Sequence, residues 1–551
     1  MKYSLEIKIF FISLIIITIQ SILNSIFTLP KGDQTNFLYA AEQLYNGGKL
    51  GLEVWEVKPP LHLLIISTIY IFKKSLIAVH VGELVLNLLA IFIFYISSKT
   101  KLNKNLIYCS SIFYIFFYYF GTPSYERFQV EGLFNPILII SISLLFSEKK
   151  ILHILSGIFF SFFFLSKIVG IFFLLIIFYF FKKNLIRFFI GTLIGIFVII
   201  ILINHFGSIH QVIDDLNLTI FFRDYSSQLS FKNIILENIL GNLFFSLFFF
   251  IKISAPILFF IIFFSDYSNV KIKLRHIVNC LIILLPPLFI VILQSKFYLY
   301  HFYYFIPCVA YIYGFYFSKI FRLDLAIFNK KIIHKVTLIL FVIIFPIFIF
   351  FFAEKIDQRV SKFKNRFSYL TNFYSFSIET KYFYNIIFKD LSLNDYRALI
   401  FENFDINFNT FSNLISNKNT KINTSELKIS KILKLSNYVK DNTTKNEKVL
   451  YLVNGYFPYY VERSSYNKYF TPHPFKKIYK NNNKLNKKYE DKILNFEKSL
   501  LQYEGKFIIL SNWFPIEKVD NFKDKLNNYY FINKISFEYG KEKFYLYERL
   551  N

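Results

Sequence analysis

Residues Phe188–Asn204 read FFIGTLIGIFVIIILIN, an almost unbroken apolar run. Similar runs occupy Ile9–Ile26, Ile239–Phe264 and Ile332–Phe352. Each of these runs approaches or exceeds the roughly 18–20 residues that a helix needs to cross a hydrocarbon core of about 30 Å. Because the backbone inside lipid must satisfy its own hydrogen bonds, the runs are expected to be helices. The sequence therefore predicts a polytopic α-helical membrane protein.

Composition supports this class. Of the 551 residues, 55% are hydrophobic and 18% are charged, whereas ordinary soluble domains are about 25% charged. The net charge of +27 is explained first by lysines on cytoplasmic loops, and second by attraction to anionic lipid or to a phosphate-bearing substrate. No compact soluble basic motif is present, so we expect no nucleic-acid partner. The three cysteines lie in or beside apolar runs and predict neither a disulfide framework nor a cysteine zinc site.

Short loops rich in lysine and arginine predict the orientation, because such loops stay on the cytoplasmic side. Placing these loops and the N-terminus inside, with an uncleaved first span, gives about eleven crossings. The segment Pro59–Phe72 is short and begins with two prolines, so it is expected to be a half-buried helix on the outer face. The expected spans are 8–27, 76–97, 106–120, 132–147, 151–166, 168–181, 187–206, 239–264, 276–294, 298–318 and 332–352.

The last part of the chain has a different character. In residues 353–551 the apolar runs shorten and Asn, Lys, Glu and Asp become frequent. Lys448–Val453 and Lys506–Leu510 read as buried strands beside helical stretches. We expect a membrane domain over 1–352, with its first outer loop at 28–75, and a soluble extracytoplasmic α/β or α+β domain over 353–551.

Two polar residues stand out in the first outer loop. Asp33 follows the first span by a few residues and precedes a helical pattern, so it fits both a helix N-cap and a general base. Lys58 stands where the chain returns to the interface, at the depth of a lipid phosphate, and it also fits an interfacial lysine that reaches toward water. Each residue alone leaves both interpretations open.

The loop as a whole is more specific. The pattern Asp33…Tyr39-Ala40…Gly47-Gly48…Glu56-Val57-Lys58-Pro59-Pro60 resembles the first periplasmic loop of the dolichyl-phosphate-mannose–protein mannosyltransferase superfamily. It is most similar to the bacterial branch that includes the lipid A aminoarabinose transferase. The resemblance implies the C-type glycosyltransferase fold. Glu56 lies two residues before Lys58 rather than directly before it, so no metal role is assigned to it.

Three later stretches agree with this resemblance. Gly157–Gly170 resembles the family's glycine and apolar run that ends in a lysine, here Lys167. Lys296–Pro307 resembles the family's basic residue and Tyr/His pair before a late span, which here include Tyr300, His301 and Tyr303. In Tyr125–Pro136 the family's outer-loop acidic residue matches Glu131, with Glu126 as the rival.

The resemblance implies an inverting transfer of a sugar from a polyprenyl-phosphate donor to a glycolipid, polysaccharide or protein. Asp33 would take the proton of the acceptor hydroxyl, and Glu131 would orient the acceptor or a sugar hydroxyl. Lys58, then Lys167 and Lys296, would stabilise the departing phosphate. The pocket would include Tyr39, Glu56, Glu126, Tyr300, His301 and Tyr303.

Several alternatives stay open beside this interpretation. Lys167 and Lys296 also fit helix-end charges that reach water, and His301 also fits the aromatic belt at a membrane interface. No cofactor is firmly implied, and a divalent metal is left open. A lipid or lipid-linked-sugar flippase is the rival function, although such proteins hold ionisable residues near the midplane. The expected location is a bacterial inner membrane, with the C-terminal domain outside.

Overall fold

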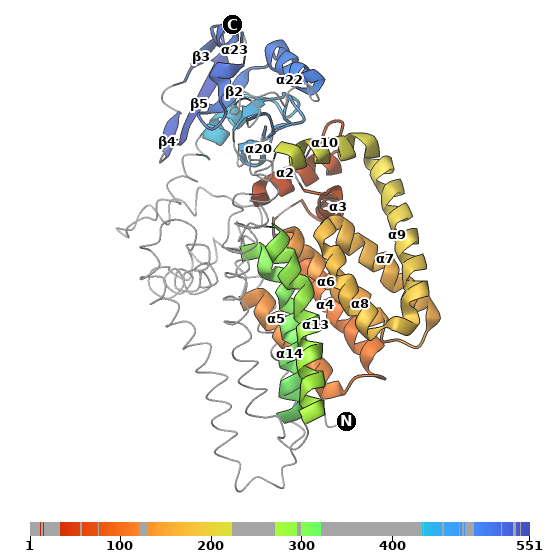
Figure 1. The fold of residues 1–551 in the computed structure, drawn as a ribbon. Helices are drawn as coiled ribbons and strands as arrows, with labels where there is room; N and C mark the ends of the chain where they lie inside the picture. Colours follow the sequence, from red (N-terminus) through yellow and green to blue (C-terminus); the bar gives the residue numbers. More distant parts are fainter. Residues whose placement is uncertain are drawn as a thin grey trace, which may run out of the picture. The chain divides into compact units, whose positions relative to one another are not determined.

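The computed structural model describes most of the helical region and most of the C-terminal sheet (Figure 1). The statements below concern these residues alone. They are 33–55, 58–74, 76–120, 129–222, 270–294, 299–320, 435–453, 457–472, 474–476, 490–519, 521–532, 536–539 and 542–550, with the single positions 12, 15, 432 and 479.

Eight expected spans coincide with helices. They correspond to α4 (Leu76–Ser98), α5 (Lys104–Phe120), α6 (Val130–Leu144), α7 (Lys150–Ser166), η2 with α8 (Ile168–Phe173, Leu174–Phe180), α9 (Leu185–Phe206), α13 (Val270–Gln294) and η6 with α14 (Leu299–Tyr304, Phe305–Ile320). Among the described residues, Ala78–Ser98 and Lys182–Phe206 are long and apolar enough to cross a membrane. The expected spans 239–264 and 332–352, and the expected domain boundary after residue 352, lie outside the described residues, and the expected span 8–27 is described only at positions 12 and 15.

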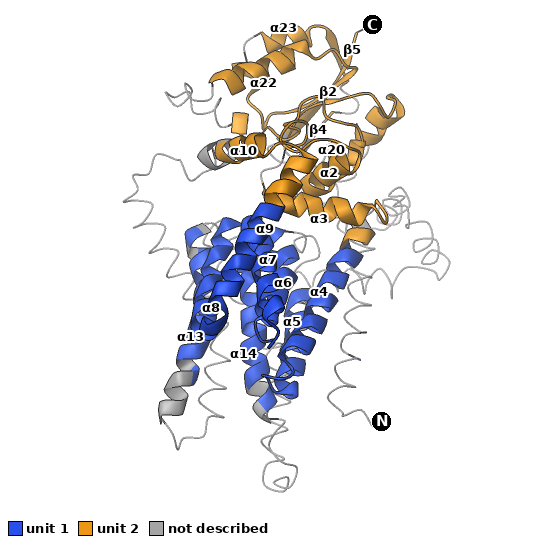
Figure 2. Cartoon of the chain, turned by 90° about the vertical axis from the view of Figure 1, so that its right-hand side faces the viewer, with its two compact units in different colours: residues 1–28, 80–198, 229–391 blue, residues 29–79, 199–228, 392–551 orange. Residues whose placement is uncertain are grey.

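The chain divides into two compact units (Figure 2). The first unit comprises 1–28, 80–198 and 229–391, and the second comprises 29–79, 199–228 and 392–551. In the first unit, α5 packs along α14 and α6 packs along α7, while α13 contacts η2, α8 and α14. A core of apolar and tyrosine side chains from α4, α5, η6 and α14 fills the space between these helices.

Glycines allow the helices of this unit to approach closely. A Cβ on Gly157 would lie 1.9 Å from the Phe188 carbonyl oxygen of α9, and a Cβ on Gly191 would lie 1.9 Å from the Ile154 carbonyl oxygen of α7. Small residues at such contacts are typical of membrane helix pairs, whose association depends on close van der Waals packing.

The second unit gathers the first loop, a helix after α9 and the C-terminal sheet. The loop forms α2 (Asp33–Tyr45) and α3 (Pro60–Tyr70), which pack on each other. With 11 residues, α3 is too short for a complete crossing, as expected for the segment after the two prolines. The segment after α9 forms α10 (Ile209–Phe222), a helix that the sequence reading did not include.

The sheet has five strands in the order β1-β2-β5-β3, with β4 also pairing with β5. The first two strands are parallel, so a crossover that includes α20 (Phe457–Val461) and α22 (Glu490–Gln502) joins them, and the other pairs are antiparallel. The strands are β1 (Leu450–Leu452), β2 (Phe507–Ser511), β3 (Tyr529–Phe531), β4 (Phe537–Tyr539) and β5 (Glu542–Arg549). The strands expected around Lys448–Val453 and Lys506–Leu510 thus correspond to β1 and β2.

Both faces of the central strands are buried, which explains why the two segments read as continuous apolar runs. Ile508 and Leu510 belong to one core, and Phe507 and Ile509 belong to the other, as the two-residue period of a strand requires. The first core also contains Trp55, so the end of the first outer loop is part of the folded sheet unit.

Candidate functional site

The second unit places Asp33 beside Lys58. Asp33 is the first residue of α2, where the helix dipole favours a carboxylate. Its Oδ2 atom lies 3.9 Å from Nζ of Lys58, and the Asp33 side chain is 49% exposed whereas the Lys58 side chain is 9% exposed. No capping hydrogen bond is seen for the Asp33 side chain among the described residues. The arrangement is a solvent-accessible carboxylate next to a largely buried cation.

The packing of α2 on α3 creates this pair. The ring of Phe37 meets the ring of His62 edge-on with centroids 4.5 Å apart, and Lys58 Nζ lies 5.9 Å from the Phe37 centroid. Pro59 and Pro60 start α3, since proline suits the first turn of a helix, where its missing N–H costs nothing. Lys58 therefore directly precedes Pro59, the residue that caps the start of α3.

Tyr39 lies in the packed interior of the second unit. Its hydroxyl accepts a hydrogen bond from the Ser465 backbone N–H at 2.6 Å and donates toward the Arg463 carbonyl at 3.5 Å. Burial raises the pKa of Tyr39 well above its usual range, so the phenol keeps its proton. Its observed contacts join α2 to the chain that follows α20, and a role for Tyr39 in lining the pocket stays a prediction.

The first unit holds a second cluster around Glu131. The Glu131 carboxylate in the first turn of α6 is fully buried and is paired with Lys167, which follows the last residue of α7. His301 of η6 is also buried, and its Nε2 lies 3.8 Å from Oε1 of Glu131. The structure thus brings together three residues that the sequence reading had placed on three separate segments.

Several buried polar atoms near Glu131 have no hydrogen-bond partner among the described residues. They are Oε2 of Glu131, Oδ1 of Asn135 and the hydroxyl of Tyr304. Glu131 and Asn135 share a face of α6 because they are four residues apart. Since buried polar groups in proteins are nearly always hydrogen-bonded, these atoms suit a ligand that offers hydroxyl groups.

The other expected residues fall into two groups. Tyr303 belongs to the core shared by α4, α5 and α14, and its carbonyl accepts a 2.8 Å hydrogen bond from Asn135. Glu56, Glu126, Lys296 and the side chain of Tyr300 lie outside the described residues. Among the described side chains, no group of three or more His, Cys, Asp and Glu is placed to hold a metal ion.

An apolar cavity of about 310 Å³ lies within the first unit. Its walls come from α4, α5, α6, α8, α13 and α14, and include Phe94, Tyr114, Ile142, Phe146, Phe180 and Tyr311. The volume lies at the lower end of the range for small-molecule sites, and the apolar lining suits a hydrocarbon chain better than a sugar.

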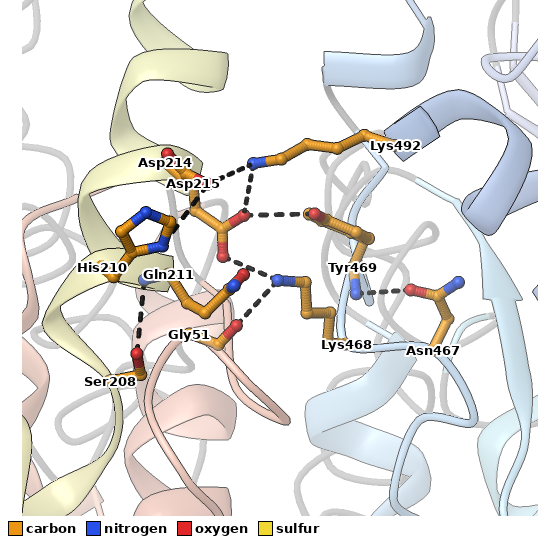
Figure 3. A network of polar contacts seen from close by, with 10 residues as sticks. All are labelled: Gly51, Ser208, His210, Gln211, Asp214, Asp215, Asn467, Lys468, Tyr469 and Lys492. Atoms are coloured by element: carbon orange, nitrogen blue, oxygen red, sulfur yellow. Dashed lines mark hydrogen bonds and ion pairs between the residues drawn. The ribbon is translucent and has the colours of Figure 1, made fainter. Parts of the chain in front are cut away.

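The sequence reading missed one polar network in the second unit. Asp215 of α10 is buried and contacts Lys468, Tyr469 and Lys492 (Figure 3). The sequence around Asp215 does carry a pattern that predicts this network. Val212 and Leu216 are spaced so that they share one apolar face of a helix, and Asp215 lies on the same face. An acidic residue on the apolar face of a short amphipathic helix indicates a buried partner.

Comparison with solved structures identifies the fold. The crystal structure of ArnT from Cupriavidus metallidurans bound to undecaprenyl phosphate matches with a TM-score of 0.52 and 9% identity, over 98% of this chain and 97% of that one. The apo crystal structure of ArnT has a TM-score of 0.46 at 10% identity, over the same shares of the two chains. No protein-family model matches the sequence, and no curated protein matches it. The chain therefore shares the fold of ArnT, and the fold implied by the first loop is confirmed.

Proposed function

We propose that this chain is an integral membrane glycosyltransferase that takes a sugar from a polyprenyl-phosphate carrier and attaches it to a hydroxyl group of an acceptor. The observation that carries the proposal is the pair of Asp33 and Lys58, an accessible carboxylate 3.9 Å from a largely buried ammonium group. The fold shared with ArnT, whose crystal structure contains undecaprenyl phosphate, supports the same class of donor.

The proposed reaction is a single displacement with inversion. The acceptor oxygen attacks the anomeric carbon, the bond from that carbon to the phosphate oxygen breaks, and the electron pair leaves with the polyprenyl phosphate. Asp33 accepts the proton of the attacking hydroxyl. Lys58 stabilises the negative charge that grows on the leaving phosphate, and a cation with few water contacts does this well because the local dielectric is low.

The Glu131 cluster contributes binding. Oε2 of Glu131 accepts a hydrogen bond from a hydroxyl of the sugar or the acceptor, since no described residue satisfies this buried atom. Lys167 is the second candidate for a phosphate oxygen, and binding there would exchange part of its pairing with Glu131 for a contact with the donor. The apolar cavity of the first unit is a candidate site for part of the hydrocarbon chain.

The test uses the full chain in lipid nanodiscs with a panel of synthetic polyprenyl-phosphate sugars. Release of polyprenyl phosphate from one donor that disappears in Asp33→Asn, with an unchanged melting temperature, supports the proposal and names the sugar. An Asp33→Asn protein that turns over as fast as the wild type overturns the general-base role. Absence of sugar release from every donor, with transbilayer movement of a lipid, assigns the chain to the flippases instead.

A further inference from the structure

Asp215 forms the centre of a buried ion cluster in the second unit (Figure 3). Its Oδ2 atom lies 2.9 Å from Lys468 Nζ, and its Oδ1 atom accepts a 3.2 Å hydrogen bond from the Tyr469 hydroxyl. Lys492 Nζ lies 3.7 Å from the same Oδ1 atom. The Asp215 side chain is only 4% exposed, so these partners take the place of water around its carboxyl group.

Tyr469 is held as a hydrogen-bond donor in this cluster. Burial, followed by the adjacent Asp215 carboxylate, raises the pKa of Tyr469 well above its usual range. The phenol therefore keeps its proton and donates a hydrogen bond to the Asp215 carboxyl group. The ring of Tyr469 also meets Trp55 with centroids 5.4 Å apart, so the same side chain packs against the end of the first loop.

The cluster is joined directly to the backbone of that loop. Lys468 Nζ donates a second hydrogen bond, 2.7 Å long, to the Gly51 carbonyl. Gly51 in turn donates from its N–H to the Val54 carbonyl at 2.9 Å and has a φ of +74°, which favours glycine. The turn that begins seven residues before Lys58 is thereby fixed to α10 through the side chain of Lys468, which is partly buried.

Asp215 and Lys58 also line one small cavity of about 20 Å³, together with Gly51 and Trp55. The neighbouring residue Leu50 pairs with Phe206–Ser208 through backbone hydrogen bonds of 2.9 and 3.1 Å. The two anchors act on the adjacent residues Leu50 and Gly51, so the start of the turn at residues 50–54 has little freedom to shift.

The chain segment that contains Lys468 also forms hydrogen bonds with α2. The Ser465 N–H donates to the Tyr39 hydroxyl, and Ser464 Oγ lies 3.1 Å from Oε1 of Gln43. Residues 464–469 therefore contact both the helix that begins at Asp33 and the turn that leads to Lys58. Residues 464–469 thus contact the first outer loop in two places, although they lie hundreds of residues after it in the sequence.

We propose that Asp215 is a positioning residue for Lys58, acting through Lys468 and the Gly51 carbonyl, and that residues 464–469 form a brace for the first outer loop. This inference rests on the proposed function, in which Lys58 binds the phosphate of the donor. Loss of the brace is expected to displace Lys58 without removing its charge. A misplacement of about 1 Å can reduce a rate roughly 100-fold, so kcat/KM should fall about 10- to 100-fold.

The test compares Asp215→Asn, Lys468→Met and Lys468→Arg in the full chain in nanodiscs. Asp215→Asn and Lys468→Met should each raise KM for the polyprenyl-phosphate sugar and lower kcat/KM per folded enzyme. Lys468→Arg keeps the charge and a donor for the Gly51 carbonyl, so it should recover most of the activity. Glu462→Gln is the matched control, since it removes an ion pair of the same 2.9 Å length from an exposed position of the same unit.

A double-mutant cycle separates positioning from general stability. If Asp215 acts through Lys58, Asp215→Asn should cost less than about 3-fold in a Lys58→Met background, because the residue that it positions is already gone. Equal losses in both backgrounds would overturn the inference, and so would a Lys468→Arg protein no better than Lys468→Met.

A second measurement is independent of turnover. Acetylation of Lys58, followed by mass spectrometry, should be several-fold faster in Asp215→Asn than in the wild type or in Glu462→Gln. An unchanged labelling rate would contradict the inference even if the variant loses activity. If the wild type transfers no sugar at all, the proposed function fails, and the labelling rate then decides the positioning role alone.

Discussion

Replacing Lys58 with methionine should separate the chemistry of the first loop from its stability. Methionine keeps an unbranched apolar stem of similar length, so it removes the charge, together with the 5.9 Å approach of Nζ to the Phe37 ring, and little else. The two effects of the charge, on folding and on catalysis, can then be compared in one variant.

The expected effect on folding is small. Two unit charges 3.9 Å apart attract by about 1 kcal/mol in bulk water and about 4 kcal/mol at an effective dielectric constant of 20. Because the Asp33 side chain is 49% exposed, water screens the pair, and the net contribution should be about 1 kcal/mol or less. The melting temperature of Lys58→Met should therefore lie within a few degrees of the wild type.

The expected effect on catalysis is much larger. Removing one preorganised charge or donor from a developing anion commonly costs about 100- to 1,000-fold in kcat, which corresponds to about 2.7–4 kcal/mol. The assay is release of polyprenyl phosphate in nanodiscs at saturating and limiting donor. Lys440→Met is the matched control, because it removes another lysine of the same unit that is paired with a carboxylate, here that of Glu462.

Two results would refute this reasoning. A Lys58→Met enzyme within about 3-fold of the wild-type kcat/KM would show that Lys58 does not stabilise the leaving group. A loss of activity that tracks a large fall in melting temperature would show that the charge supports the fold rather than the reaction.

Three further predictions concern the structure around the site. Gly51→Ala should lower the unfolding free energy by about 1–3 kcal/mol in denaturant titration, because φ is +74° and the new Cβ would meet the Val212 nitrogen at 2.9 Å. Burial raises the pKa of Glu42 above its ordinary value, so Glu42 ionises at a lower pH in the unfolded chain than in the folded chain. Ionisation therefore favours unfolding, and the melting temperature of the wild type relative to Glu42→Gln should fall as the pH rises above 4.5. Glu83→Ala should cost about 3–5 kcal/mol in thermal unfolding, because this buried carboxylate pairs with His80 and Tyr118, whereas Glu148→Ala at an exposed pair should leave the melting temperature unchanged.

The helices of the first unit could be predicted because hydropathy alone defines them. A run such as that of α9 must be helical in lipid, and its start follows from Lys182 and Lys183, which precede it. The close contacts between these helices could not be predicted with the same ease. Gly157 and Gly191 are ordinary glycines in the sequence, and only the helix pairing shows that each faces the backbone of its partner.

The second unit was harder to predict because its parts are far apart in the chain. The strands at Leu450–Leu452 and Phe507–Ser511 were expected from their apolar runs, since both faces of each strand are buried. The contact of Trp55 with the core of this sheet depends on a separation of hundreds of residues, and no local pattern carries that information. Asp215 was overlooked for the same reason, because its partners lie near residue 468.

For the candidate site, too, the sequence predicted some features and not others. The family resemblance singled out Asp33, Lys58, Glu131, Lys167 and His301, and the structure groups them as one pair and one cluster of three. Sequence spacing could suggest which residues matter, but not which carboxylate pairs with which cation. That choice depends on helix packing, which places Lys167 at the end of α7 beside the start of α6.

The surroundings of the two carboxylates favour different roles. Glu131 is fully buried, and both Lys167 and His301 lie against its Oε1 atom, so only Oε2 is left for a hydroxyl of the ligand. Asp33 is half exposed, and its described partner is 3.9 Å away, a distance too long for a hydrogen bond. A general base must be reached by the acceptor and must have a free oxygen lone pair for the proton, and Asp33 meets both conditions. Glu131 is better suited to hold a hydroxyl in a fixed orientation, because a buried carboxylate moves little and binds strongly.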